Sequence, residues 1–222
     1  MGTAPKLRTA AEAVALIERG ATVMVGGFGL AGTPMTLLAA VLEAPAAREL
    51  TIVSNNLGEP DRGLGRLLLD GRVRKAVGSF FTSNRDALEW QADGRLEIEL
   101  LPQGTLDEAI RAGGAGIGGF FVKTSAGTLL AAGREQRLID GETYVLQQPL
   151  RADVALLKAA RADELGNLAY ARTARNFNPD MATAARCVIA EVEEIVPVGV
   201  LAPDDVVTPH VYVDVLVSSE AA

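Results

Sequence analysis

Residues 22–34 read Thr-Val-Met-Val-Gly-Gly-Phe-Gly-Leu-Ala-Gly-Thr-Pro, and this stretch decides the fold. Thr22 to Val25 is a short β-branched run typical of a buried strand. A glycine-rich turn follows, and then Thr33 and Pro34 predict a helix start, with Thr33 as N-cap and Pro34 as the first helical residue. A strand, a tight turn and a helix in this order are the opening unit of a parallel α/β sheet.

The same alternation of strand and helix extends outward from this stretch through the first half of the chain. Upstream, a capping box at Thr9 and Glu12 predicts a helix over 10–19 that ends at Gly20. Downstream, Ser83 is expected to cap one helix, and a second capping box at Thr105 and Glu108 is expected to open another. The predicted strands span 50–53 and 96–101, with another within 73–81, and the predicted helices span 34–43, 62–69, 83–91 and 105–114.

The second half of the chain has a different pattern. The segments 136–139 and 143–147 flank Asp140-Gly141, which is a strong β-hairpin signal. Further strands are expected at 154–158, 187–192 and 211–217. Since no linker or repeat interrupts the chain, we predict a single domain over 1–222. Its expected class is α/β, with an open, mostly parallel twisted sheet, flanking helices and an antiparallel portion.

Composition excludes several classes of function. Lys and Arg are scattered in a chain of net charge −7, which argues against nucleic-acid binding. No apolar run approaches the roughly 18–20 residues of a membrane helix, and no signal peptide is evident. The single cysteine, Cys187, lies in an expected strand and is interpreted as an inert core thiol. These features predict a cytoplasmic protein with no disulfide framework and no metal site.

Residues 27–32 match the GxGxxG pattern of dinucleotide-binding turns. That motif also needs an acidic residue at the end of the second strand to hold the ribose, and Ser54-Asn55-Asn56 stands there instead. A nicotinamide-dependent oxidoreductase therefore stays only as an alternative. The turn could equally serve packing alone, or let a polar ligand lie across backbone amides at a helix N-terminus.

Three amide side chains follow predicted strands: Asn55 and Asn56 after the second, and Gln103 after the fourth. Because the carboxyl ends of parallel strands share one edge of a sheet, these residues and the glycine turn are expected to meet in one crevice. Neutral amides can stabilise an oxyanion without neutralising a nearby carboxylate nucleophile. The alternative is that each amide only bonds its local backbone in a turn.

The chain lacks a recognisable nucleophile to accompany this oxyanion site. His210 is the only histidine and precedes the last expected strand, so a Ser-His-Asp triad is not predicted. Asp107 and Glu108 are interpreted as helix-start residues, and Glu191 as part of a solvated strand end. We therefore expect the nucleophile to come from a second chain.

These motifs resemble the α (A) subunit of the family I CoA-transferases along nearly the whole chain. The matching segments, in order, are 25–34, Ser54-Asn55-Asn56, 71–75, 102–106, 113–117, Asp140-Gly141, 150–153, 163–167, 174–179 and Thr208-Pro209. Two departures stand out. Residues 123–128 read Lys-Thr-Ser-Ala-Gly-Thr where the family usually reads Pro-Thr-Gly-Val-Gly-Thr, and His210 replaces a usual glycine.

The resemblance implies a fold shared with several sugar-phosphate isomerases and a partner β subunit, in a heterodimer or an α2β2 heterotetramer. It implies coenzyme A as a substrate, with no permanently bound cofactor. A glutamate of the β subunit would attack the acyl-CoA and pass through a mixed anhydride to a glutamyl-CoA thioester. The likeness is greatest to 3-oxoacid CoA-transferases, which use succinyl-CoA or acetyl-CoA with acetoacetate or 3-oxoadipate. The Ser-Asn-Asn form favours the succinyl-CoA enzymes.

The resemblance also implies roles for particular residues. Asn55, Asn56 and Gln103 would line the active site and help to stabilise its anionic intermediates. The proposed CoA-binding turn would consist of Gly26, Gly27, Phe28, Gly29, Leu30, Ala31 and Gly32. A non-catalytic domain that binds CoA or a phosphosugar is a further alternative, since the fold and the missing nucleophile fit it too.

Overall fold

A computed structural model describes residues 6–219, and its centre is a sheet with strand order β11-β10-β8-β1-β2-β3-β4. Every neighbouring pair along this path is parallel, and the short β9 joins β8 antiparallel. This sheet confirms the predicted mostly parallel α/β architecture. Its strands are β1 (Thr22–Val25), β2 (Leu50–Val53), β3 (Val73–Gly78), β4 (Glu97–Leu100), β8 (Ala152–Asp163), β9 (Leu168–Ala169), β10 (Ala185–Val196) and β11 (Val215–Ser218).

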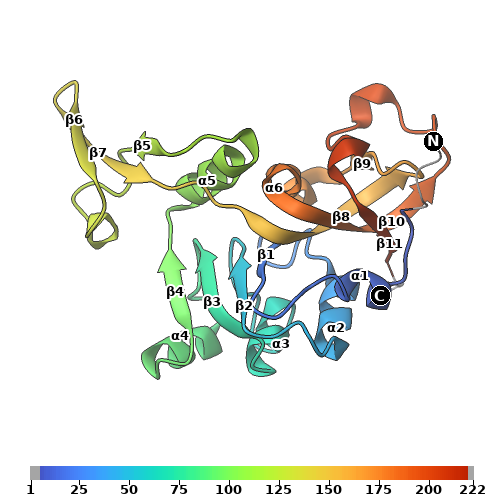
Figure 1. The fold of residues 1–222 in the computed structure, drawn as a ribbon, viewed down its shortest axis with the longest axis horizontal. Helices are drawn as coiled ribbons and strands as arrows, with labels where there is room; N and C mark the ends of the chain where they lie inside the picture. The colour runs from blue at the N-terminus through green and yellow to red at the C-terminus, as the bar shows by residue number, and fades with distance from the viewer. Residues whose placement is uncertain (1–5, 220–222) are drawn as a thin grey trace.

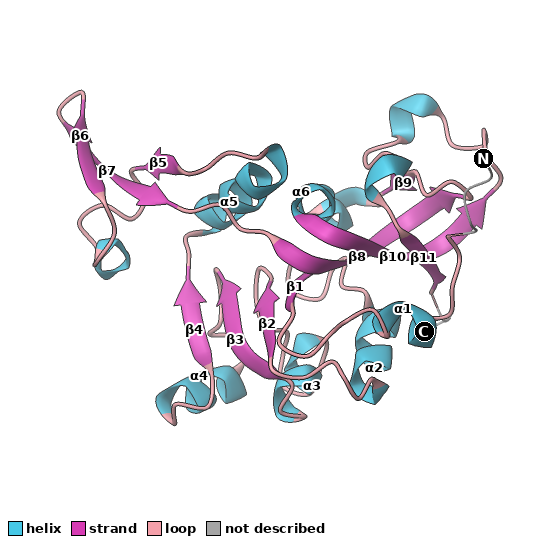
Figure 2. Cartoon of the chain, in the orientation of Figure 1, coloured by secondary structure: helices cyan, strands magenta, loops and turns pink. Residues whose placement is uncertain are grey.

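Helices cover both faces of the sheet (Figures 1 and 2). One face carries α1 (Ala10–Val14), α2 (Met35–Glu43), α3 (Leu64–Leu69) and α4 (Arg85–Ala92). The other carries α5 (Gln103–Ala115) and α6 (Asn178–Ala184), which pack against each other. Short 3-10 turns lie at Leu129–Ala131, Arg172–Arg175, Pro203–Asp205 and His210–Tyr212.

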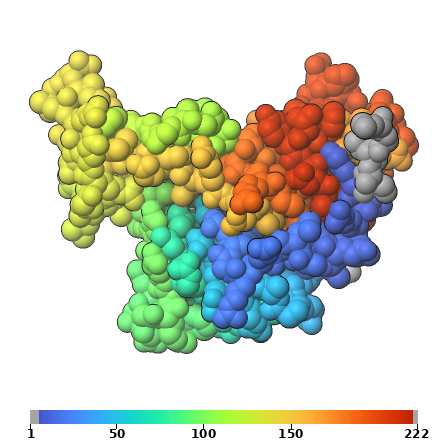
Figure 3. Space-filling view, viewed as in Figure 1, coloured from blue at the N-terminus to red at the C-terminus, as the bar shows by residue number. Residues whose placement is uncertain are grey.

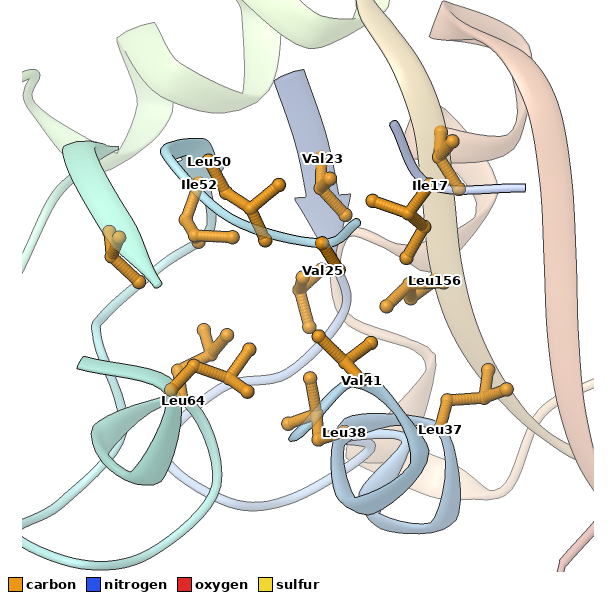
Figure 4. Packing of buried hydrophobic residues seen from close by; sticks show 14 of the residues in the cluster. Ile17, Val23, Val25, Leu37, Leu38, Val41, Leu50, Ile52, Leu64 and Leu156 are labelled. Carbon is orange, nitrogen blue, oxygen red and sulfur yellow. The ribbon is translucent and has the colours of Figure 1, made fainter. Parts of the chain in front are cut away.

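The two largest hydrophobic cores follow the alternation of side chains along the strands. Val23 and Val25 of β1 point into the core shared with α1 to α4, whereas Met24 between them belongs to the core under α5 and α6. In Figure 4 the first core is closed by Leu37, Leu38 and Val41 of α2. Since successive residues of a strand face opposite sides, burial of both faces explains why β1 has an almost continuous apolar sequence.

Strand order reverses at β1, which fixes where a ligand site can form. From β1 the sheet grows through β2, β3 and β4 on one side and through β8, β10 and β11 on the other. In open parallel sheets the crevice outside the carboxyl ends of the strands at such a reversal is the usual binding position. The glycine turn leaves β1 at this point.

A second, three-stranded antiparallel sheet projects from the body (Figure 3). It consists of β5 (Phe120–Val122), β6 (Gln136–Ile139) and β7 (Glu142–Gln147), in the order β5-β7-β6. Asp140 and Gly141 both have positive φ, 50° and 80°, as a two-residue type I′ hairpin requires. The predicted hairpin is therefore confirmed, while β5 was not predicted.

Helix starts differ from the sequence predictions at three places. Pro34, not Thr33, is the N-cap of α2, and Asn84, not Ser83, caps α4 through its side chain. Helix α5 already begins at Gln103, so Thr105 lies inside its first turn and the predicted second capping box is wrong. The capping box at Thr9 and Glu12 is confirmed, although α1 ends at Val14, short of the predicted Arg19.

Glu191 is not part of a solvated strand end, contrary to the prediction. Its side chain is 2% exposed and lies 3.0 Å from the ammonium of Lys158 on the neighbouring strand β8. Its other carboxylate oxygen accepts the backbone N–H of Leu37, in the first turn of α2, at 3.1 Å. Because Pro34 provides no side-chain cap, Glu191 supplies one from a strand that is distant in sequence.

Asp163 offers a test of stability against pH. Burial favours the protonated carboxyl, but hydrogen bonds from Asn167, Gly166 and Leu165 outweigh it, so the pKa of Asp163 lies below its usual value. A carboxylate with a lowered folded-state pKa adds stability above its unfolded pKa of about 3.9 and loses it as the pH falls through the folded value.

We expect Asp163→Asn to lower the free energy of unfolding by about 1.5–3 kcal/mol at pH 7, because charge-assisted bonds are lost. The difference from the wild type should shrink below about pH 4 in urea denaturation. Asp61→Asn is the control, since that side chain is 84% exposed and should change stability by less than about 0.5 kcal/mol. A difference that is constant from pH 7 to pH 3 would contradict this account.

Candidate functional site

A pocket of about 340 Å³ opens at the carboxyl ends of β1, β2, β3 and β4. The segment after each strand contributes to its wall. The lining residues are Phe28, Gly29, Asn55, Asn56, Gly58, Glu59, Ser79, Phe80, Ser83 and Gln103. The structure thus brings the three predicted amides and two residues of the glycine turn together at the predicted edge of the sheet.

The two asparagines of this pocket differ in their hydrogen bonds. The Oδ1 atom of Asn56 accepts the backbone N–H of Gly58 at 3.0 Å, which is the local turn interaction expected of asparagine. Asn55 is 2% exposed, and its Nδ2 atom is buried without a hydrogen-bond partner among the described residues. A buried donor left unsatisfied costs about 1–3 kcal/mol, so Asn55 is the lining asparagine that retains a donor for a further hydrogen bond.

Gln103 and two aromatic residues complete the wall. Gln103 is exposed and is the first residue of α5, so the start of that helix places its amide at the pocket. Phe80 is 54% exposed and Phe28 is 49% exposed, which gives the pocket two aromatic surfaces. Aromatic side chains at the wall of a pocket offer apolar contact area to a ligand.

Sequence reasoning did not select Glu59, Ser79, Phe80 or Ser83 as site residues. Ser79 follows β3, and the carboxyl-end rule that identified Asn55 and Gln103 would have found it too. Its Oγ atom is buried and, like the amide of Asn55, has no hydrogen-bond partner among the described residues. No sequence signal pointed to Glu59, because it does not directly follow the end of β2. Its carboxylate pairs with Arg62 at 3.1 Å.

Only part of the glycine turn faces the pocket. Phe28 and Gly29 line it, whereas Gly26, Gly27, Leu30, Ala31 and Gly32 do not. Several backbone amides of the turn already donate within the protein: Gly26 to Leu156, Gly27 to the side chain of Asn176, and Phe28 to Ala31. These three N–H groups are therefore occupied and cannot receive a ligand without breaking a bond.

Gly26 is a glycine because another side chain occupies the space of a Cβ. A Cβ built there would lie 2.0 Å from Oδ1 of Asn178, the first residue of α6. Asn178 is fully buried and accepts the backbone N–H of Lys158 at 3.1 Å. The glycine thus permits close packing of α6 onto the end of β1.

We expect Gly26→Ala to destabilise the chain by about 1–3 kcal/mol through overpacking, measured by urea denaturation. In the double variant Gly26→Ala/Asn178→Ala, the glycine substitution should cost clearly less than it does alone, because the side chain it collides with is gone. Gly104→Ala is the control, since nothing lies within 4 Å of a Cβ there. Additive effects of Gly26→Ala and Asn178→Ala would contradict the steric explanation.

The remaining features singled out in the sequence lie outside the pocket lining. His210 donates its backbone N–H to Asn167 and its ring lies 3.2 Å from the same oxygen, in a 3-10 turn where part of a strand was predicted. Burial raises the pKa of the Cys187 thiol, as an unreactive cysteine requires. Neither His210 nor residues 123–128 line the pocket, so these departures from the family pattern do not change its wall.

Residues 6–219 contain neither a metal cluster nor a membrane-spanning helix. No group of three or more His, Cys, Asp or Glu side chains there could hold a metal ion. In the same range, no helix has the length and apolar character needed to cross a membrane.

Residues 7–219 match the coenzyme A transferase family. The A subunit of the succinyl-CoA:3-ketoacid coenzyme A transferase of Xanthomonas campestris pv. campestris is 50% identical, over 91% of this chain and 83% of its own. The A subunit of the 3-oxoadipate CoA-transferase of Pseudomonas putida is 48% identical, over 96% of this chain and 92% of its own.

Among solved structures, an acyl-CoA transferase from E. coli O157:H7, crystallised as a thioester complex with CoA, superposes with a TM-score of 0.87 at 22% identity. The match covers 97% of this chain and 50% of that one, so this chain spans about half the length of the solved enzyme. At this identity the superposition shows a shared fold.

Proposed function

Because the chain belongs to the coenzyme A transferase family as an α (A) subunit, we propose that it moves CoA from an acyl-CoA to a 3-oxoacid. The proposed donor is succinyl-CoA, and the proposed acceptors are acetoacetate and 3-oxoadipate. The names of the two relatives, a 3-ketoacid and a 3-oxoadipate transferase, support this substrate class. We propose that the enzyme works in the cytoplasm.

The proposed chemistry needs a carboxylate nucleophile that a partner β subunit supplies, in a heterodimer or heterotetramer. The carboxylate attacks the thioester carbon, and the CoA thiolate leaves to give a mixed anhydride. The thiolate then attacks the enzyme carbonyl, which releases the donor acid and forms an enzyme thioester. The acceptor acid repeats these steps in reverse order. Each attack on a carbonyl creates negative charge on an oxygen, which donors fixed in place must stabilise.

The unpaired amide of Asn55 is the observation that carries this proposal. Asn55 lines the pocket, and its buried Nδ2 atom has no acceptor among the described residues. An oxyanion bound in the pocket would provide that acceptor, and the bond would be strongest when the oxygen carries its full charge. Gln103, which lies beyond the end of β4, is proposed as a second donor, and Asn56 as a residue that shapes the wall.

The size of the pocket suggests how CoA is arranged. A volume of about 340 Å³ lies at the lower end of the range for small-molecule sites. We propose that it holds the short acyl group and the reacting sulfur, while most of CoA lies outside. Phe28 and Gly29 would then be the part of the predicted CoA-binding turn that contacts the substrate.

The test of this function compares the purified chain alone with the chain co-expressed with its β subunit. CoA exchange between succinyl-CoA and acetoacetate or 3-oxoadipate should require both subunits. Glu59 is the only carboxylate among the lining residues, so Glu59→Gln belongs in the same assay. Transfer by the chain alone that Glu59→Gln abolishes would make Glu59 the nucleophile and refute the proposal of a split site.

A further inference from the structure

The backbone at Asn176 is held in an unusual conformation. Its φ and ψ are 28° and −128°, in a region that glycine occupies readily and other residues avoid. Residues kept in such regions cost on the order of 1–3 kcal/mol each and persist only when surrounding contacts determine them. The contacts that hold Asn176 are therefore informative about its role.

The side chain of Asn176 joins the two ends of the glycine turn. Its Oδ1 atom accepts the backbone N–H of Gly27 at 3.0 Å, and its Nδ2 atom donates to the carbonyl of Ala31 at 3.2 Å. The two residues between them that line the pocket are Phe28 and Gly29. A single carboxamide thus spans the base of the segment that presents the pocket wall.

Neighbouring groups fix the orientation of that carboxamide. Nδ2 of Asn176 also donates to the carbonyl of Ala174 at 2.9 Å, and Oδ1 also accepts Nδ2 of the buried Asn178 at 3.2 Å. The amide of Asn176 is therefore not free to rotate, since reversing its ends would place donors against donors.

The close approach of this segment also accounts for Gly32. A Cβ at Gly32 would lie 2.4 Å from the carbonyl oxygen of Ala174 and 2.5 Å from Nδ2 of Asn176. Gly26 makes room for Asn178 in the same way. Two glycines of the proposed CoA-binding turn thus make room for residues 174–178 of this chain.

From this geometry we propose that Asn176 is a positioning residue for the candidate site: its side chain clamps Gly27 and Ala31 so that Phe28 and Gly29 face the pocket. The inference rests on the proposed function for its effect on CoA transfer. The clamp itself is a property of the chain and can be tested without that function.

Asn176→Gly separates positioning from stability. Glycine adopts the observed backbone angles without strain. The variant therefore loses the side chain that clamps the turn, and it also loses the backbone strain of Asn176. We expect the melting temperature to stay equal to that of the wild type or to rise. We expect kcat of the complex with the β subunit to fall at least about tenfold, in the range of effects seen when active-site geometry is loosened. Arg172→Gly is the matched control, because exposed Arg172 also has a positive φ, 49°, in the same segment.

Hydrogen exchange of the isolated chain provides the second readout. The amide of Gly27 should exchange at least about tenfold faster in Asn176→Gly than in the wild type or in Arg172→Gly, since its acceptor is gone. If wild-type complexes transfer no CoA, the proposed function fails, and faster exchange at Gly27 still supports the clamp.

Three results would overturn the inference. One is a kcat of Asn176→Gly within about threefold of the wild type. Another is a fall in kcat accompanied by a lower melting temperature, which would indicate a purely structural residue. The last is unchanged exchange at Gly27.

Discussion

Asn55→Ala is expected to lower kcat for CoA transfer by about 10²–10³, the loss seen when one oxyanion donor is removed, with a smaller change in KM. The Nδ2 atom of Asn55 is buried and lacks a partner among the described residues, so removing this donor breaks no bond with them. The measurement is steady-state kinetics of the complex of both subunits, together with the melting temperature of the variant chain.

Two further variants make this prediction specific. Asn55→Asp keeps the shape of the side chain but replaces the donor with a carboxylate, so it should be at least as damaging as Asn55→Ala. Asn56→Ala removes the acceptor for the N–H of Gly58 and should mainly cost about 1 kcal/mol of stability. Should Asn56→Ala lower kcat by about 10² while Asn55→Ala changes it less than about threefold, the roles assigned to these neighbours are reversed.

Glu191→Ala is expected to reduce the free energy of unfolding by about 3–5 kcal/mol, the cost of breaking a buried ion pair by removing one partner. The ammonium of Lys158 would lose its buried counter-ion, and the N–H of Leu37 would lose its acceptor. For a chain of this size the melting temperature should fall by about 6–20 °C. Urea denaturation and thermal melting of the isolated chain measure both quantities.

Glu193→Ala is the matched control for that experiment. Glu193 lies 3.4 Å from the same ammonium of Lys158, but its side chain is 60% exposed. Exposed pairs contribute about 0–1 kcal/mol, so this variant should stay within that range. Equal losses from the two substitutions would show that burial of Glu191 does not matter and would contradict its role as a distant helix cap.

The parts of the fold that depend on local sequence were predictable. β1 and β2 have the predicted bounds because short β-branched runs between turn residues leave few alternatives. The Asp140-Gly141 hairpin follows from the positive φ that both residues tolerate. Helix starts were less predictable, because Ser83 and Asn84 are both capable caps, and only the buried bond from Asn84 to the carbonyl of Leu57 decides between them.

The site residues that directly follow the carboxyl ends of parallel strands were predictable, and the others were not. The carboxyl-end rule places Asn55, Asn56 and Gln103 at one edge, and the structure puts all three on one pocket. What the sequence could not reveal are long-range partners. Glu191 reaches Leu37 across 154 positions, and Asn176 reaches Gly27 across 149, with no local pattern to mark either pair.

The place of β8 in the sheet determines when the pocket can be finished during synthesis. β1 lies between β2 and β8, and the clamp on its turn comes from residues 174–178. A ribosome that has just passed Gln103 has made every lining residue of the pocket. It has made neither β8, which flanks β1 on the side away from β2, nor Asn176, which secures the turn. Such non-local parallel pairings form slowly and leave apolar edges open while they wait. The nascent chain therefore keeps one edge of β1 unpaired until β8 emerges, and the turn after β1 is secured only once Asn176 has been made.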